Sequence, residues 1–189
     1  VEQSDDDKPT QGHGDDAARW MLVAGEAADE DPTVFTPLSS RGAAEGLAEQ
    51  VERARQQGAT VHVGGTVTDE AGARFAPAVI TGVTSEMDAY REELFGPVAV
   101  VYKVESADEA LALANDSQYG LGGAVFSRDE AQAERIARQL EVGMANVNTP
   151  AGEGAEIPFG GFKRSGFGRE LSVFALDEFV NKQYLYVND

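Results

Sequence analysis

Helix-like and strand-like segments alternate along this chain from about Asp31 onward, and that alternation limits the folds open to it. Apolar residues recur with helical spacing in three stretches, 44–51, 107–114 and 133–140. The short runs between them are apolar on both faces, as strands of a covered parallel sheet are. This order predicts βαβ units with right-handed crossovers, and therefore an α/β fold in which helices flank a parallel sheet in three layers. The predicted strands are 60–63, 98–102, 124–126, 145–148 and, near the C-terminus, 183–187.

Local signals mark where the helices and turns begin and end. Gly58 is suited to end the first helix, and Ser106 with Glu109 forms a capping box at the start of the second. Ser127 with Glu130 is the predicted cap of the third helix, and Gly143 lies just beyond its end. Turn residues at 64–65 and 69–72 predict a small hairpin, and a short helix is predicted from near Arg169.

The chain of 189 residues divides into three predicted parts. Residues 1–30 are rich in Asp, Gly and Gln and predict an acidic, poorly ordered tail. Residues 31–180 carry the alternating pattern and predict one α/β domain. Residues 181–189 contain the final strand.

The formal net charge of −18 argues against several classes of partner. Binding to nucleic acid or to an anionic membrane surface needs a basic patch, and no apolar run approaches the ~20 residues of a membrane span. The first residues lack the basic and apolar character of a signal peptide, so we expect a cytoplasmic protein. Val1 in place of Met suggests a fragment or a processed product. The acidic, lysine-poor composition fits a salt-adapted protein or an ordinary soluble acidic one.

The absence of cysteine limits the chemistry available to these residues. It excludes disulfides, thiolate metal sites and thiol catalysis within them. His13 and His62 are far apart and form no ligand-spaced pair, so no metal site is predicted.

Two further features are ambiguous when read alone. The glycines between Gly160 and Gly168 can turn backbone N–H groups toward an anion. However, Lys163 is followed by Arg164 and not by Ser or Thr, so the segment does not match the sequence pattern of a nucleotide-binding P-loop. A tight turn is the alternative, and Lys163 and Arg164 are assigned no role. The pair Glu92-Glu93 would ordinarily be a solvated charge pair.

Four sequence motifs that follow one another in a fixed order are more informative than any of these features alone. They are 92–98 (EELFGPV), 114–121 (ANDSQYGL), 143–148 (GMANVN) and 158–170 (PFGGFKRSGFGRE). This series resembles the C-terminal part of the NAD(P)-dependent aldehyde dehydrogenase superfamily. The resemblance covers roughly Asp31 to Val187, whereas residues 1–30 show little or none. It implies an incomplete catalytic domain with a C-terminal oligomerisation strand.

The resemblance also implies a mechanism and a limited set of site residues. In that family a cysteine thiolate attacks the aldehyde, hydride passes to the nicotinamide and water cleaves the thioester. The family's cysteine, general base, oxyanion asparagine and cofactor domain lie N-terminal to the matched part, so no catalytic residue is predicted here. Glu93 and Phe95 match residues at the nicotinamide ribose and ring, and Phe159 and Glu170 match residues of the substrate pocket. For Glu170 a carboxylate in the first turn of the predicted last helix, facing the helix dipole, is an equal alternative. Tight binding of NAD or NADP by this chain alone is not expected.

Two hypotheses of different class follow. Either the chain is the C-terminal fragment of an oxidoreductase that converts an aldehyde to a carboxylic acid with NAD(P), inactive alone, or it is a non-catalytic remnant that serves as a binding or assembly module. Its predicted partners are a small aldehyde in the full-length family, an N-terminal partner chain, or a second copy through Gln183–Val187. Apolar surface left bare around Val98–Tyr102 and at that last strand predicts self-association that increases with salt.

Overall fold

The computed structural model describes residues 36–68, 72–152 and 154–188. The predicted acidic tail, residues 1–30 with His13, lies outside the described residues. The chain forms two compact units, and the boundary between them falls between Lys103 and Val104.

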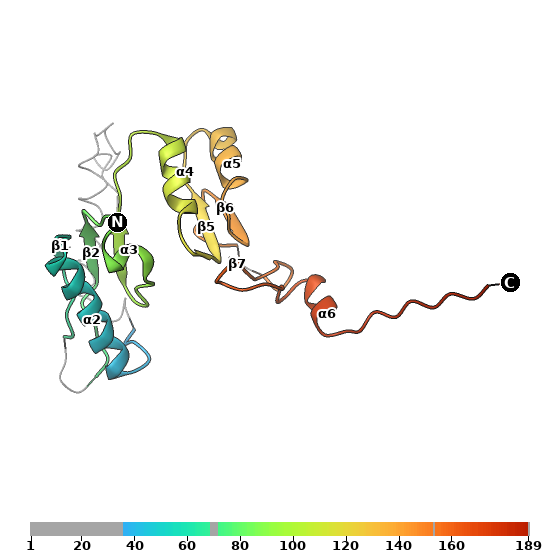
Figure 1. The fold of residues 1–189 in the computed structure, drawn as a ribbon, viewed down its shortest axis with the longest axis horizontal. Helices are drawn as coiled ribbons and strands as arrows, with labels where there is room; N and C mark the ends of the chain where they lie inside the picture. Colours follow the sequence, from blue (N-terminus) through green and yellow to red (C-terminus); the bar gives the residue numbers. More distant parts are fainter. Residues whose placement is uncertain (1–35, 69–71, 153, 189) are drawn as a thin grey trace, which may run out of the picture. The chain divides into compact units, whose positions relative to one another are not determined.

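The first unit contains a mixed three-stranded sheet (Figure 1). Strand β2 is central; it pairs antiparallel with β1 and parallel with β3. The prediction of a wholly parallel sheet is therefore wrong here. The reason is that the connection between β1 and β2 folds back on itself through an antiparallel bridge from Val67 to Phe75, at the predicted small hairpin, and forms no crossover helix between the strands. The elements are α2 (Arg41–Gln56), β1 (Thr60–Val63), β2 (Ala78–Thr81), α3 (Asp88–Arg91) and β3 (Val98–Val101).

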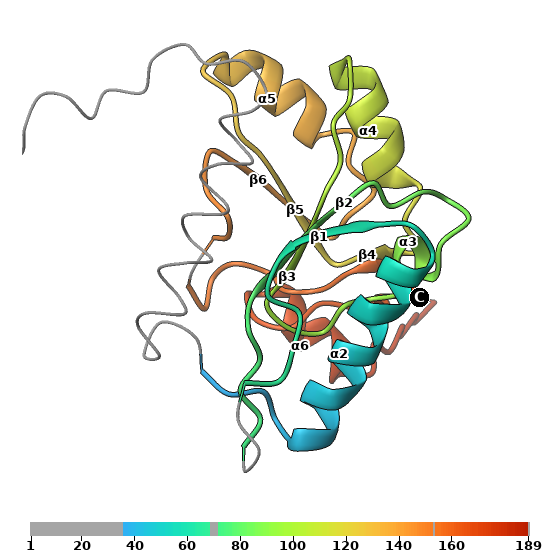
Figure 2. The same ribbon diagram turned by 90° about the vertical axis from the view of Figure 1, so that its left-hand side faces the viewer.

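The core of this unit is built by helix α2 and strand β2. Figures 1 and 2 show α2 alongside the sheet, and its apolar stripe packs Leu47 and Val51 into one cluster with Ile80. Val51 and Ile80 are almost completely buried, which contributes about 1.5–3 kcal/mol each. The Ser40 side chain caps α2 by accepting from the Ala43 N–H, at 3.1 Å. Strand β2 was not among the predicted strands; it follows directly on Pro77, a residue that usually interrupts strand patterns.

The second unit contains a β5-α5-β6 unit in which β5 and β6 are parallel neighbours, as the alternation predicts. A separate antiparallel pair, β4 with β7, brings the glycine-rich segment to Tyr119 and Gly120. The described residues thus form three small sheets. The α/β class is confirmed, while the three-layer arrangement remains a prediction. The elements are α4 (Ala107–Asn115), β4 (Tyr119–Gly120), β5 (Gly122–Val125), α5 (Glu130–Ala137), β6 (Met144–Val147), β7 (Phe162–Lys163) and α6 (Phe174–Glu178).

The observed N-cap of α4 agrees with the sequence-based prediction, whereas the N-cap of α5 differs from it. Ser106 caps α4, because its hydroxyl accepts from the Glu109 N–H at 3.1 Å. The predicted Ser127 cap of α5 is wrong: Asp129 is the N-cap, and its carboxylate accepts from the Gln132 N–H at 3.0 Å. Ser127 instead accepts from the Asp129 N–H, a turn that precedes the helix.

The C-terminal residues differ from the prediction. The last helix, α6, begins at Phe174 and not near Arg169, because Glu170 is held in a β-bridge to Phe159. Residues 181–188 follow α6 as an exposed extended segment with no ladder partner among the described residues (Figure 1). A strand requires a neighbour for its backbone groups, so the oligomerisation strand remains a prediction.

Candidate functional site

The loop between α3 and β3 carries both predicted cofactor residues. Its side chains alternate in direction: Leu94 packs against the core of the first unit, whereas Phe95 is 81% exposed. Gly96 then approaches α2 so closely that an added Cβ would collide with Leu47 Cδ2. Leu94 and Gly96 thus fix the loop from its inner side and leave Phe95 pointing away from the core.

Glu93 leaves its carboxylate available for a ligand. The residue is exposed, and among the described residues its carboxylate has no hydrogen bond or ion pair; only its main-chain oxygen accepts, from Gln50 Nε2 at 3.3 Å. Its neighbour Glu92 is instead bound through Oε2, which accepts from Arg53 Nη2 at 2.7 Å and from Gln50 Nε2 at 3.1 Å. The sequence pair Glu92-Glu93 therefore contains one bound carboxylate and one free one.

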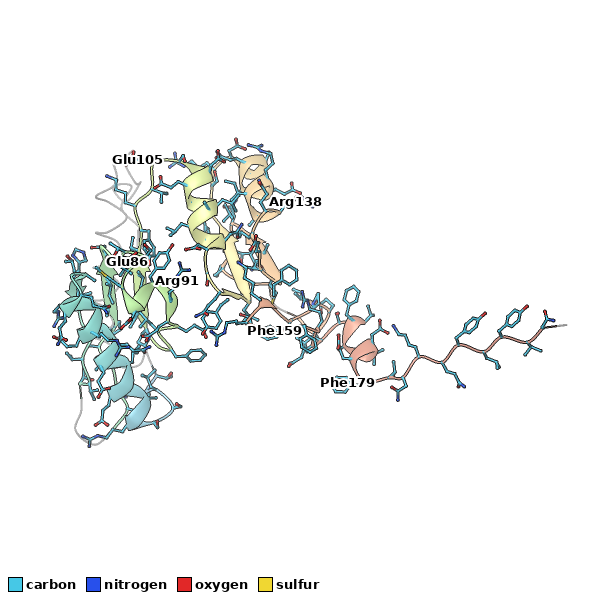
Figure 3. All side chains as sticks on the ribbon, in the orientation of Figure 1. Glu86, Arg91, Glu105, Arg138, Phe159 and Phe179 are labelled. Carbon is cyan, nitrogen blue, oxygen red and sulfur yellow. The ribbon has the colours of Figure 1, made fainter. Side chains whose placement is uncertain are left out.

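The structure joins the two predicted substrate-pocket residues directly. Phe159 and Glu170 exchange both main-chain hydrogen bonds, at 2.9 Å and 2.7 Å, so their side chains share one face of an antiparallel pair. Phe159 is 43% exposed and is labelled in Figure 3, and Glu170 is exposed as well. Both lie in the second unit, whereas Glu93 and Phe95 lie in the first.

The glycine-rich segment is anchored by the side chain of Lys163. Its Nζ donates to the Asn115 carbonyl at 2.7 Å and the Ser117 carbonyl at 3.0 Å, just where α4 ends, and pairs with Glu141 Oε2 at 2.7 Å. A cation at a helix C-terminus is favourable because the last carbonyls have no partner within the helix. Asn115 in turn ties the chain after α5, since its amide donates to the Gln139 carbonyl and accepts from the Glu141 N–H.

The backbone of this segment is unusually constrained. Lys163, Leu171 and Ser172 adopt positive φ angles of 54°, 59° and 54°, a backbone conformation that residues other than glycine rarely adopt. Gly143 is required beside it, because an added Cβ would collide with the Gly160 carbonyl oxygen. Such strain persists only where the surroundings hold it, and it concentrates here around the Phe159–Glu170 bridge.

An open hollow of about 500 Å³ lies on the glycine-rich segment, lined by residues 161–163 and 166–169. It does not include Phe159 or Glu170, so it is not the predicted substrate pocket. Arg169 is already occupied there: Nη1 donates to the Gly161 and Gly168 carbonyls, and the guanidinium lies 5.3 Å from the centre of the Phe162 ring. Lys163 also lines the hollow, and its Nζ is engaged by the Asn115 and Ser117 carbonyls and by Glu141.

Two further kinds of feature are absent from the residues that the structure describes. That part of the chain contains no cluster of three or more His, Asp or Glu side chains able to hold a metal ion. It also contains no helix long and apolar enough to cross a membrane.

Comparisons with known proteins now agree with the motifs. Residues 15–185 match the model of the aldehyde dehydrogenase family, and the chain belongs to that family. The resemblance seen in the sequence is confirmed, and it begins earlier than the predicted Asp31, within the first 30 residues. Aldehyde dehydrogenases are oxidoreductases.

Individual relatives share a substrate class in their names. The chain is 54% identical to the succinate-semialdehyde dehydrogenase [NADP(+)] of Deinococcus radiodurans, over 86% of this chain and 34% of the relative. It is 42% identical to the succinate semialdehyde dehydrogenase [NAD(P)+] Sad of Escherichia coli, over 90% of this chain and 37% of the relative. The chain therefore spans about a third of the length of these curated relatives.

Solved structures show the same fold. The succinic semialdehyde dehydrogenase of Streptococcus pyogenes, solved in complex with NADP+, superposes with a TM-score of 0.83 at 36% identity, over 93% of this chain and 40% of that one. The protein Gox0499 superposes with a TM-score of 0.77 at 47% identity, over 80% of this chain and 33% of that one.

Sequence reasoning missed the residues that hold the site. Lys163 was assigned no role, and nothing in the sequence singled out Gln50 or Arg53. Their spacing of three residues places them on one face of α2, but their target lies 39–43 residues further along the chain and only the fold brings it within reach.

Proposed function

We propose that this chain forms part of the catalytic region of an aldehyde dehydrogenase that oxidises a semialdehyde, such as succinate semialdehyde, to the carboxylic acid with NADP or NAD. The free, exposed Glu93 carboxylate beside the exposed Phe95 ring carries the proposal. The substrate class rests on the names of the relatives. The thiol nucleophile would come from sequence outside these 189 residues, which contain no cysteine.

Glu93 and Phe95 fit the nicotinamide end of such a cofactor. A carboxylate without protein partners can accept from both ribose hydroxyls, and charge-assisted hydrogen bonds contribute roughly 1.5–3 kcal/mol each. An exposed phenyl ring beside it offers a flat apolar face to the nicotinamide ring. When bound, the cofactor supplies the hydride acceptor, and these side chains orient it.

Phe159 and Glu170 would contribute to the aldehyde side of the site. The phenyl ring supplies apolar wall, and the carboxylate on the same face of the bridge is able to hold a proton or a water molecule near the reacting carbon. We further propose that Gln183–Val187 pairs with the sheet edge of a second subunit, because its extended backbone groups lack partners within the described chain.

A chimera tests the proposed function. Residues 31–187 would replace the matched segment of the Deinococcus radiodurans relative, which supplies the remaining parts. We expect the chimera to oxidise succinate semialdehyde with NADP, and Glu93→Gln to raise the KM for NADP about tenfold or more, since 1.4 kcal/mol corresponds to tenfold. Glu86→Gln, an exposed glutamate of the same unit, is the matched control and should change nothing.

Two results would overturn the proposal. One is a chimera whose thermal unfolding midpoint equals that of the unmodified Deinococcus radiodurans enzyme but which oxidises no aldehyde. That result would favour the non-catalytic assembly module. The other is the 189-residue chain reducing NADP with succinate semialdehyde by itself. Calorimetry adds a check, because the chain alone should bind NAD or NADP more weakly than millimolar.

A further inference from the structure

Helix α2 has a polar face directed at α3 and the loop after it. Arg53 lies between two carboxylates that flank α3: its Nε is 3.0 Å from Asp88 Oδ2 and its Nη2 is 2.7 Å from Glu92 Oε2. Gln50, one turn earlier, donates to Glu92 Oε2 at 3.1 Å and to the Glu93 carbonyl at 3.3 Å. Both residues therefore act on the segment that carries the proposed cofactor carboxylate.

A third side chain of the same face completes the attachment. Gln57 donates to Asp88 Oδ2 at 3.1 Å and accepts from the Asp88 N–H at 3.0 Å. This matters because the N-cap residue of α3 is Met87, which provides no side-chain cap. Gln50, Arg53 and Gln57 follow helical spacing, so one face of α2 holds α3 from its first residue to the loop beyond it.

The network differs from an isolated surface ion pair. A single exposed pair contributes little, because two flexible side chains must be ordered for a screened attraction. Here one planar guanidinium holds two carboxylates, and two amides share the same oxygens, so the geometry is specified by several donors. The hydrogen bond and charge of Glu92, with a smaller contribution from Asp88, raise the pKa of Arg53.

The loop is thereby held on two sides. Leu94 and Gly96 pack inward against the core, and the Glu92 carboxylate and Glu93 carbonyl are bound by the polar face of α2. Only the Glu93 carboxylate and the Phe95 ring are left without protein partners among these side chains. A four-residue helix could not hold that arrangement alone, since isolated short helices are marginal.

We propose that Gln50 and Arg53 are positioning residues for the cofactor, which aim the free Glu93 carboxylate at the nicotinamide ribose by holding Glu92 and the Glu93 carbonyl. This inference rests on the proposed function of Glu93. It assigns the two glutamates different tasks, Glu92 as the anchor and Glu93 as the ligand.

Hydrogen exchange on the 189-residue chain tests the anchoring without any activity. Arg53→Met should make the amides of residues 92–97 exchange at least about threefold faster, and Arg53→Lys should fall between the two, because an ammonium cannot bridge both carboxylates in the same plane. Arg55→Met is the matched control, since Arg55 pairs with Glu52 on the same helix. Equal exchange in the Met variants of residues 53 and 55 would overturn the inference.

Kinetics of the chimera test the consequence for the cofactor. Arg53→Met should raise the KM for NADP about threefold to tenfold, with kcat and the KM for the aldehyde within about twofold of the unmodified chimera. Faster exchange with an unchanged KM for NADP would show that the network is structural and would overturn the positioning role. Failure of the proposed function shows itself separately, as a Glu93→Gln chimera with an unchanged KM.

Discussion

The two compact units bury their apolar residues to very different degrees. Of the fourteen buried hydrophobic residues in the described chain, twelve lie in the first unit and only Ala133 and Ala137 lie in the second. Of the seventeen large hydrophobic residues exposed there, fifteen lie in the second unit, among them Phe179, which projects from the end of α6 in Figure 3. Helix α4 buries no residue at all, although its apolar spacing predicts a core-facing helix.

This contrast shows which unit can be stable by itself. The first unit closes a core between α2 and its sheet, and the loop of Glu93 and Phe95 is held on that core by Leu94. The second unit presents apolar side chains that need cover, and hydrophobic stabilisation requires that apolar area be removed from water. In a whole aldehyde dehydrogenase we expect that cover to come from other parts of the protein or from a second subunit.

The largest expected effect lies in the core of the first unit. Ile80→Ala should lower the free energy of unfolding by about 2–5 kcal/mol, because Ile80 is fully buried and leaves a cavity. Leu176→Ala in the second unit, where Leu176 is 69% exposed, should change it by less than about 0.5 kcal/mol. Urea unfolding of both variants is the measurement. Equal losses in the free energy of unfolding would contradict the difference in burial between the two units.

The next effect concerns the anchor of the glycine-rich segment. Lys163→Met should cost about 1–3 kcal/mol, because it leaves the Glu141 carboxylate and two carbonyls without their donor. Lys182→Met is the control, since Lys182 is 72% exposed and pairs only with Asp177. Hydrogen exchange should locate the change at residues 160–168; protection there equal to that of the unmodified chain would contradict the anchoring role.

A smaller effect on stability, but a clear one on association, is expected at the exposed apolar surface. Phe179→Ser should leave unfolding within about 0.5 kcal/mol yet reduce self-association at 1 M salt, where the Debye length of ~3 Å screens the charge of −18. Phe95→Ser in the first unit should reduce it less. Sedimentation at low and high salt measures this, and a monomer under both conditions would show that the second unit needs no cover.

The smallest effect is a pH dependence in the first unit. Burial raises the pKa of the Tyr102 phenol above its ordinary value near 10. The unfolded state therefore loses this proton first, so the stability that Tyr102 provides is complete below about pH 10 and is lost as pH rises through the folded value. Tyr102→Phe should weaken the loss of stability above pH 10, whereas Tyr184→Phe, at an 84% exposed position, should not.

Much of the fold was predictable because it depends on local order. The three predicted helices and the strands at 60–63, 98–102, 124–126 and 145–148 all have counterparts, since helical spacing and short β-branched runs act within a few residues. Errors arose where a neighbour decided the outcome. Strand β2, the antiparallel β1 and the Asp129 cap depend on partners that no short window contains.

The candidate site divides in the same way. By itself the sequence determined the family, through four motifs in order, because residue identity and spacing are local facts. The site roles of Glu93, Phe95, Phe159 and Glu170 stay predictions from the same motifs. Only the tertiary structure decided that Glu92 is an anchor while Glu93 is free, that Phe159 pairs with Glu170, and that Lys163 ties the glycine-rich segment to the end of α4. Those outcomes are set by contacts between residues eleven to 48 positions apart, because a carboxylate is bound or free only according to what the fold brings within hydrogen-bonding distance.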